Sequence, residues 1–358
     1  MSDGNGRMLS KDNRLYFIDF LKGIAMLGVI LVHFNAVFNS PISALSKAAS
    51  LGARCPQLFF IVSSFLTWVG FEKGQVKWGE FYKRRFIRIA PVYYFALIVC
   101  VLLPTVRLMD ISAGNYISHI LFLNGFVPEY SNSILSVEWY IADLAIFYML
   151  CPILKKAVKD LRSSVIAFLL SVCLSSLSLI VFNHFFYELI ETDSAYEMYF
   201  HTFCFVHQIP VILLGIMLYY LIKQADSKKI RNTLIISGIA VAVITVLFET
   251  LNLNNRFMTT SLIAGLAFAW IFLLCYSINN LFEKTIFRPL AFIGAHSFGI
   301  YCLHQVIINS FDEMSINKES IMLWFICSVI IFALSILVGY LAEYSQKKIV
   351  AICSKNKR

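Results

Sequence analysis

Ten stretches of roughly 20 mostly apolar residues divide the chain, and they constrain its fold more than any other feature. A helix needs about 20 such residues to cross the hydrocarbon core of a bilayer. Hydrophobic residues make up 59% of the 358 positions and charged residues 14%, against about 45–50% and about 25% in soluble domains. The sequence therefore predicts an all-α, polytopic bundle of about ten membrane-spanning helices. Their expected ranges are 15–38, 51–71, 90–108, 134–154, 164–186, 203–222, 233–251, 257–279, 289–311 and 320–342.

The Lys and Arg residues predict the orientation, because loops on the cytoplasmic side carry an excess of positive charge. With the N-terminus in the cytoplasm, 24 of the 30 basic residues fall in cytoplasmic stretches, and Lys22 lies inside the first span. The five in outer stretches are Lys47, Arg54, Arg107, Arg256 and Lys318. This asymmetry accounts for the net charge of +9 without a nucleic-acid partner. We expect a polar cytoplasmic head over 1–14, a membrane domain over 15–342 and a basic cytoplasmic tail over 343–358, with both ends irregular.

The first span differs from a cleaved signal peptide, because it is longer than a signal's apolar region and lacks a small-residue cleavage pattern. The nine cysteines show no metal-ligand spacing and fall mostly inside the predicted spans. We interpret them as small buried apolar residues and expect no metal cofactor.

Ionisable side chains inside spans are informative, because they are costly in lipid and usually face a bundle interior or a water-filled cavity. In the first span Lys22 and His33 are eleven residues apart, close to three helical turns, so both lie on one face, about 16 Å apart along the axis. That stripe suits a long substrate lying across the membrane, or a relay between its two faces. Alternatively, Lys22 extends to cytoplasmic phosphates and His33 is an ordinary histidine of the bundle interior.

Two later spans carry polar residues at related depths. The fourth places Glu138 near its outer end and Asp143 deeper, at a depth comparable to that of Ser63 in the second span.

In the ninth span, Ser297, Tyr301 and His304 are spaced i, i+4 and i+7 and form one polar stripe, with His304 at the depth of His33. Each stripe alone is compatible with contacts between helices. Together, two histidines, an acid and a serine on separate spans indicate a site.

Three arginines, Arg84, Arg85 and Arg88, cluster at the cytoplasmic mouth of the third span. Arg85 and Arg88 are i and i+3 and can share one phosphate-bearing ligand through their forked donors. An ordinary cluster of positive charge bound to anionic lipid headgroups explains the same residues.

Two outer segments are long. In 109–133, the apolar patch 120–126 is too short to span the bilayer, so it is interfacial or re-entrant. The segment 187–202 carries four acidic residues and three tyrosines. A solvated loop is the simpler expectation for it, and a path for a sugar is the alternative.

Six motifs, in order along the chain, resemble those of the acyltransferase-3 family of bacterial integral membrane acyltransferases, of the O-acetyltransferase type. They are IDFLKGIAMLGVILVHF, LFFIVSSFL, FYKRRFIRIAPVYY, WYIADLAIFYMLCP, HQIPVILLGIMLYYL and FIGAHSFGIYCLH. The resemblance covers most of the chain. It implies transfer of an acyl group, commonly acetyl from acetyl-CoA, to a hydroxyl of a cell-surface or lipid-linked glycan at the bacterial inner (cytoplasmic) membrane.

The resemblance also implies that the donor enters from the cytoplasm and that His33 is the general base or an otherwise essential histidine. The candidate catalytic residues are His33, Asp143, Glu138 and His304. The candidate donor-binding residues are Lys22, Arg85, Arg88, Ser63 and Tyr301. Which of Asp143, Glu138 and His304 orients His33 or the sugar stays open.

The chain departs from the family pattern at several positions. Lys22 stands where arginine is usual, which keeps the charge but loses the planar fork. Ser63 and Ser64 replace the usual Ser-Gly pair. Leu144 stands where many members have an acid, with Asp143 one place earlier. Larger members carry a C-terminal esterase-like domain, for which the sequence has no room.

A transporter or flippase for a lipid-linked sugar or another amphiphile is the alternative from another functional class. It would more often show repeat symmetry and Gly- or Pro-broken helices at matching positions, and neither is clear here. The sequence leaves open the acyl group, the acceptor, the oligomeric state, and whether transfer is direct or passes through a covalent acyl-enzyme.

Overall fold

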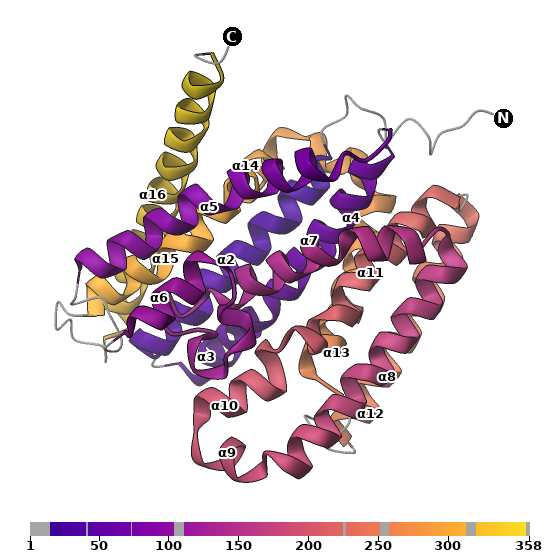
Figure 1. Ribbon diagram of the computed structural model, residues 1–358, viewed down its shortest axis with the longest axis horizontal. Helices are drawn as coiled ribbons and strands as arrows, with labels where there is room; N and C mark the ends of the chain where they lie inside the picture. The colour runs from indigo at the N-terminus through magenta and orange to yellow at the C-terminus, as the bar shows by residue number, and fades with distance from the viewer. Residues whose placement is uncertain are drawn as a thin grey trace.

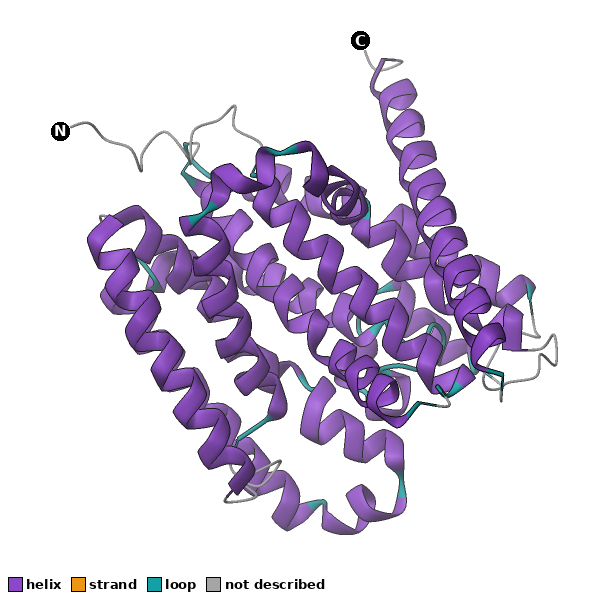
Figure 2. Cartoon of the chain, turned by 180° about the vertical axis from the view of Figure 1, so that it is seen from behind, coloured by secondary structure: helices purple, strands orange, loops and turns teal. Residues whose placement is uncertain are grey.

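The computed structural model describes residues 15–40, 42–72, 74–103, 111–224, 227–250, 258–312 and 320–355. The head expected over 1–14 and the outer residues Arg107, Arg256 and Lys318 lie outside these ranges. Within them the regular structure is helical, without a strand (Figure 2). The predicted all-α class is therefore confirmed.

Seven helical segments of this described part are long and apolar enough to cross a membrane, and an eighth candidate is a pair of helices bent by 70°. The seven are Tyr16–Phe38 (α2), Ser43–Phe71 (α3, η1 and α4), Trp78–Leu102 (α5), Leu161–Phe185 (α8), Ser194–Gln224 (α10, η5 and α11), Thr260–Ser277 (α13) and Ile321–Ile352 (in α16). The bent pair is Thr285–Ala295 (η7 and α14) with Ser297–Asp312 (α15). Two further predicted ranges hold α7 (Trp139–Ala157) and α12 (Ser227–Thr250). Each predicted segment thus contains a helix, seven or eight of the candidates in the described residues are long and apolar enough to span, and the count of about ten stays a prediction.

Local sequence explains where several helices begin, because the first turn of a helix leaves backbone N–H groups unpaired. At the start of α8, Asp160 Oδ1 accepts from the Ser163 N–H at 2.7 Å, and Ser163 Oγ accepts from the Asp160 N–H at 3.0 Å. This reciprocal pair is a capping box. Thr259 Oγ1 likewise accepts from the Leu262 N–H at 3.2 Å before α13, and Pro56 in the first turn of α4 needs no donor partner.

The helix α11 (Phe205–Gln224) lies inside the bundle, where it packs against α4 (Cys55–Phe71), α8 and α13. Helices α8 and α12 form one side of the bundle, and α5 and α16 form the opposite side (Figure 1). In α8 the buried residues are mainly serines, Ser164, Ser171 and Ser175, whereas many leucines and isoleucines are exposed. Ser175 Oγ lies 2.9 Å from His207 Nδ1 of α11. Small polar side chains toward the bundle and large apolar ones outward are the pattern of a helix that faces lipid.

The helix α16 runs without a break from Ile321 to Lys355. The expectation of an irregular tail from 343 is therefore wrong for the residues up to 355. Two contacts in this stretch explain the difference: Lys347 Nζ lies 3.7 Å from Glu343 Oε2 one turn earlier, and the Gln346 amide donates to the carbonyls of Ile87 and Arg88 in α5.

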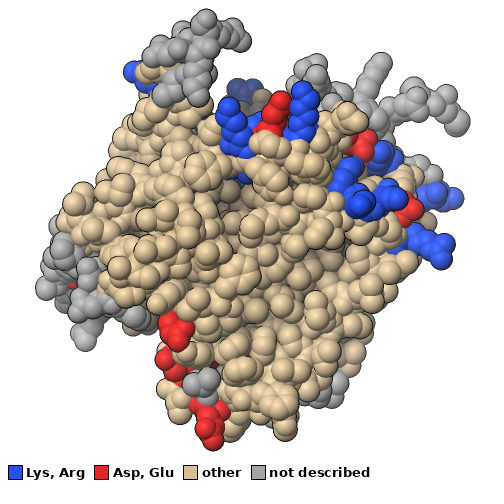
Figure 3. Space-filling view, in the orientation of Figure 1, with Lys and Arg blue, Asp and Glu red and all other residues tan. Residues whose placement is uncertain are grey.

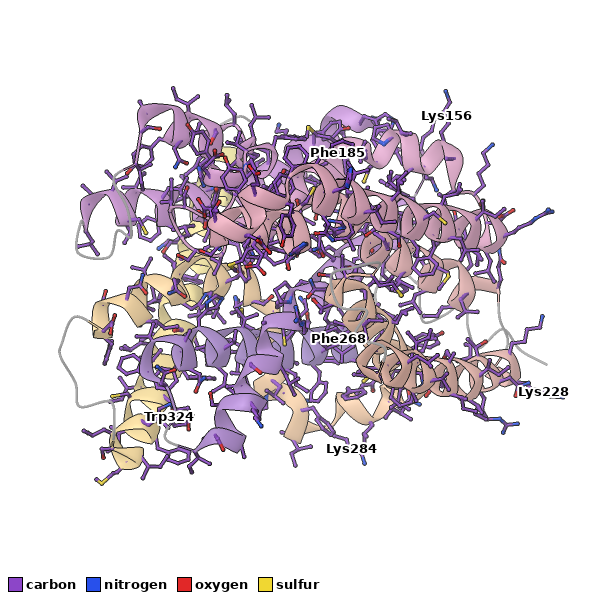
Figure 4. All side chains as sticks on the ribbon, turned by 90° about the horizontal axis from the view of Figure 1, so that it is seen from below. Lys156, Phe185, Lys228, Phe268, Lys284 and Trp324 are labelled. Carbon is purple, nitrogen blue, oxygen red and sulfur yellow. The ribbon has the colours of Figure 1, made fainter. Side chains whose placement is uncertain are left out.

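Charged side chains separate toward opposite ends of the bundle. Lys and Arg gather along the upper edge in Figure 3, and a row of acidic residues lies at the lower end, over α9 (Tyr187–Thr192) and α10 (Ser194–Met198). Seen from below, Lys156 and Lys228 lie toward one end and Trp324 toward the other (Figure 4). The separation agrees with the predicted orientation, which stays a prediction.

The two outer segments are folded against each other. The first contains α6 (Ala113–Ile120), η3 (Asn124–Phe126) and η4 (Pro128–Tyr130). Tyr199 Oη donates to the Gly125 carbonyl at 3.0 Å, and Tyr196 Oη donates to Glu129. The expectation of a solvated loop over 187–202 is therefore wrong as to the loop, because these residues form short helices that contact the first segment, while most of their described side chains are exposed.

Candidate active site

One cavity is lined by all five residues predicted to bind the donor. Its volume is about 60 Å³. The five, contributed by helices α2, α4, α5 and α15, are Lys22, Ser63, Arg85, Arg88 and Tyr301. The fold thus brings together candidates that lie in four separate motifs.

Lys22 is held at the cavity by its own helix and by the neighbouring α14. Its Nζ lies 2.8 Å from Asp19 Oδ1, one turn earlier in α2. The backbone of α14 comes so close to α2 at Gly294 that a Cβ there would overlap the Asp19 carbonyl. Glycine at this position therefore lets the bend between α14 and α15 lie directly against the Asp19–Lys22 pair.

Arg85 is fixed from three sides. Its Nη2 donates to Thr67 Oγ1 at 3.1 Å. Its guanidinium carbon lies 4.7 Å from the ring centroid of Tyr148 and 5.2 Å from that of Phe81. A planar guanidinium held on aromatic faces keeps its charge and its donors in one orientation.

Arg88 lies where the cavity meets two wider pockets at the end of the bundle that is predicted to face the cytoplasm. A pocket of about 590 Å³ between α4 and α5 also contains Lys77, Arg84 and Arg85. A second, of about 620 Å³, lies between α5, α15 and α16 and also contains Lys347. An anionic molecule arriving from this end would meet basic side chains before it reached the cavity.

Two tyrosines line the inner part of the cavity. Tyr140 Oη lies 3.4 Å from Ser63 Oγ, and the rings of Tyr140 and Tyr301 are 5.2 Å apart. Tyr301 Oη donates to the Val137 carbonyl at 2.7 Å. The Tyr301 ring therefore has a fixed position between the cavity and the histidines beyond it.

His33 and His304 lie side by side, as their equal predicted depth suggested. Their ring centroids are 5.2 Å apart, and the Tyr301 ring is 5.9 Å from that of His304. His304 Nδ1 lies 2.8 Å from the Tyr301 carbonyl and 3.2 Å from that of Ile300. Since carbonyls only accept, Nδ1 carries the proton and the buried Nε2 holds a lone pair. His304 is fully buried, whereas His33 is partly exposed.

Glu138 lies apart from this pair, in a separate buried network. Its Oε1 accepts from the Ile134 N–H at 2.6 Å and faces His119 Nε2 at 3.2 Å. Its Oε2 accepts from the N–H groups of Leu135 and Val137 at 3.0 and 2.9 Å. These contacts assign Glu138 to holding the loop before α7.

Asp143 is also turned away from the cavity. It is fully buried beside Gly125, and neither carboxylate oxygen has a hydrogen-bond partner among the described residues. Leu144 lines the cavity instead. One residue along a helix is a rotation of about 100°, so Asp143 does not take the place of the acid expected at position 144.

Several residues of the site were not singled out from the sequence. Tyr140 and Tyr148 lie within the quoted WYIADLAIFYMLCP motif, which was a usable signal. Glu343 was placed in the tail, yet its Oε1 accepts from the Gly299 N–H at 2.9 Å and its Oε2 lies 3.3 Å from His296 Nδ1. It thereby stabilises the start of α15. In the described part of the chain, no group of three His, Cys, Asp or Glu side chains is placed to hold a metal ion.

Comparison with known proteins gives a consistent result. A family model described as an acyltransferase domain matches residues 15–340. Three curated relatives are the O-acetyltransferases OatA of Staphylococcus aureus strains NCTC 8325 / PS 47, COL and MRSA252, each 25% identical over 353 residues. The match covers 90% of this chain and 55% of each relative, so the chain spans about half the length of these relatives. No solved structure shows a significant match.

Proposed function

The chain belongs to the acyltransferase family whose domain matches residues 15–340, and from this we propose that it is a membrane-embedded, acyl-CoA-dependent O-acyltransferase. The donor is cytoplasmic acyl-CoA, most simply acetyl-CoA. The acceptor is a hydroxyl of a cell-surface or lipid-linked glycan, and the location is the inner (cytoplasmic) membrane. The observation that carries the proposal is the single cavity lined by the five predicted donor-binding residues, with the two histidines beyond Tyr301.

The basic end of the cavity supports the choice of donor. CoA carries several phosphate charges, and Arg85 and Arg88 both line the 590 Å³ cytoplasmic pocket and the inner cavity. Lys22 stands further in, where it would meet the pantetheine arm. The small inner volume of about 60 Å³ favours a short acyl group such as acetyl.

The histidine pair supports the chemistry. His33 is the partly exposed ring and can accept the proton of the acceptor hydroxyl as its oxygen attacks the thioester carbonyl carbon. The C–O bond forms, the C–S bond breaks, and the proton passes from His33 to the leaving thiolate, which departs as CoA. His304, whose tautomer is set by backbone carbonyls, lies with its ring centroid 5.2 Å from that of His33, and its Nε2 lone pair is available to accept a proton or a hydrogen bond at the site. General-base help of this kind is worth about 10²–10⁴-fold in rate.

The experiment is binding and turnover of radiolabelled acetyl-CoA by the full chain in nanodiscs. Wild type is compared with His33→Ala, with Arg85→Ala/Arg88→Ala, and with His184→Ala, an exposed histidine of α8 that serves as a control. We expect His33→Ala to bind acetyl-CoA and lose turnover, the double arginine variant to lose affinity, and the control to match wild type.

Near-normal turnover by His33→Ala would remove that residue from the mechanism. If the wild type bound neither acetyl-CoA nor a longer acyl-CoA, the proposed donor would be wrong, and a transporter of lipid-linked sugars would become the better interpretation.

A further inference from the structure

Helices α5 and α16 enclose a groove that has a charged end and an apolar end. The charged end is the 620 Å³ pocket that contains Arg84, Arg88 and Lys347. Next to it lies an apolar hollow of about 500 Å³. Gln346 lines both. The hollow is lined by Pro91, Val92, Phe95, Val338, Leu341, Ala342, Ser345, Gln346 and Ile349. We call the two parts together the α5/α16 groove.

A specific contact between the two helices fixes the groove. Pro91 has no N–H, so the Ile87 carbonyl four residues earlier lacks its helical donor. The Gln346 amide donates to that carbonyl and to the Arg88 carbonyl, at 3.3 Å for the latter. The spacing of α5 and α16 at this level is therefore set by a hydrogen bond that the sequence of α5 requires.

The apolar hollow opens toward lipid. Phe95 and Leu341 are 50% and 48% exposed, and Ile349 is 61% exposed. In a bilayer these side chains contact hydrocarbon rather than water. An extended acyl chain lying between the two helices would fill the hollow.

The charged end carries three exposed cations at the cytoplasmic end of the helices, and two of them, Arg84 and Lys347, do not line the inner cavity. Arg84 and Lys347 lie 3.6 and 3.7 Å from the nearest carboxylate oxygens, of Glu80 and Glu343. These distances exceed the roughly 2.7–2.9 Å of a charge-assisted hydrogen bond. Both cations therefore keep N–H donors that a phosphate can take up.

We propose that the α5/α16 groove binds one anionic glycerophospholipid of the cytoplasmic leaflet. Its phosphate lies between Arg84 and Lys347, and one acyl chain lies along Phe95, Leu341 and Ile349. A molecule with both an anionic head and a long apolar chain matches the two adjoining parts of the groove, whereas a zwitterionic lipid gains less from the cations. The proposal does not depend on the acyl-transfer reaction. Its consequence for the site is that the lipid head stands beside Arg88, which the groove shares with the inner cavity.

The test is native mass spectrometry of the full chain titrated with palmitoyl-oleoyl phosphatidylglycerol or with palmitoyl-oleoyl phosphatidylcholine. A basic residue near anionic lipid contributes about 1 kcal/mol, so Lys347→Gln should weaken the first bound phosphatidylglycerol by about fivefold. Lys228→Gln, at the start of α12 (Figure 4), removes an equivalent charge outside the groove and should change nothing. Ser345→Trp should fill the hollow and weaken binding with the charges still present.

A melting temperature for each variant separates lost binding from misfolding. Phosphatidylglycerol should raise the melting temperature of the wild type and of Lys228→Gln. It should raise the melting temperatures of Lys347→Gln and Ser345→Trp much less. Equal retention of the two lipids, or equal losses in Lys347→Gln and Lys228→Gln, would overturn the proposal. It would also be overturned if oleoyl-CoA, and not phosphatidylglycerol, needed Lys347 and Ser345, since the occupant would then be a long-chain donor.

Discussion

The clearest prediction concerns Glu138, because the structure assigns it a positioning role where a catalytic one was expected. Its carboxylate accepts three backbone N–H groups and faces the His119 imidazole. His119 Nδ1 lies 2.9 Å from the Asn115 carbonyl and so already donates there. A proton must therefore also lie between His119 Nε2 and Glu138 Oε1. The carboxylate thus has four donors around it, and these contacts leave it no free oxygen with which to bind a substrate.

The substitution Glu138→Gln leaves the shape unchanged but replaces one accepting oxygen by an NH₂ group. In the less costly orientation that NH₂ takes the place of Oε1, where it opposes the Ile134 N–H and donates to His119 Nε2 once that nitrogen gives up its proton. Only the remaining oxygen still accepts from Leu135 and Val137. Hydrogen bonds to a charged group contribute about 1.5–3 kcal/mol each, and removing one partner of a buried pair costs about 3–5 kcal/mol. We expect the free energy of unfolding to fall by about 3–5 kcal/mol, which lowers the melting temperature by about 4–7 °C for a chain of this size.

The measurement is thermal unfolding in nanodiscs, followed by acetyl-CoA turnover well below the melting point. Turnover should fall only modestly, through Val137, whose carbonyl accepts from Tyr301. Glu129→Gln is the matched control. This exposed acid accepts from Tyr196 and has no other hydrogen bond or ion pair within the part of the chain that the structure describes, so the variant should melt as wild type does. A Glu138→Gln variant with wild-type melting and turnover reduced more than 100-fold would refute the reasoning and return Glu138 to the catalytic residues.

Three further predictions test the site and its supports. Arg85→Lys keeps the charge but loses the planar stacking on Tyr148, so the KM for acetyl-CoA should rise by about tenfold with a smaller change in kcat; an unchanged KM would mean that charge alone suffices. Gln346→Leu should cost about 1–2 kcal/mol in unfolding free energy by leaving a carbonyl unpaired. In a Pro91→Ala background Gln346→Leu should cost less unfolding free energy, because the new backbone N–H at position 91 can donate to the Ile87 carbonyl. If the two substitutions instead had additive effects in this double-mutant cycle, the proposed role of the Gln346–Ile87 hydrogen bond would be wrong. Tyr301→Phe should lower the unfolding free energy by about 1 kcal/mol, and equal melting of the two proteins would show that its hydrogen bond is dispensable.

The membrane-spanning segments were predictable because lipid leaves the backbone few choices. A chain without water must pair its own N–H and C=O groups, so long apolar runs become helices. The same constraint made Lys22 and His33 informative, because an ionisable side chain in such a run is costly in lipid unless it faces the bundle interior or a cavity. Lys22 and Arg85 were expected at one donor site because the family resemblance implies it, and Tyr301 was a further candidate on the stripe of the ninth predicted span. Their contacts with Asp19, Tyr148 and Val137 came only from the structure.

Rotation and irregular backbone limited the rest of the prediction. Sequence spacing gives the depth of Asp143 in the membrane but not the rotation of α7 about its axis. A shift of one residue along the helix therefore determines whether a side chain points into the cavity, as Leu144 does, or toward Gly125, as Asp143 does. Glu138 precedes a helix in a loop without periodicity, so its three N–H partners had no signature. The end of α16 did have one: Glu343 and Lys347 are spaced i and i+4, as in a helix that continues.

The length of α16 matters to anyone who joins a reporter protein to this chain. Hydropathy alone suggests cutting near residue 343, where the apolar run ends. Such a cut would remove Gln346, and the partly buried Ile87 carbonyl beside Pro91 would lose its side-chain donor. A junction placed beyond Lys355 keeps the helix and that hydrogen bond. Comparing the fluorescence and yield of fusions joined before Gln346 with those joined after Lys355 would show how much the folding of the protein depends on the last turns of α16.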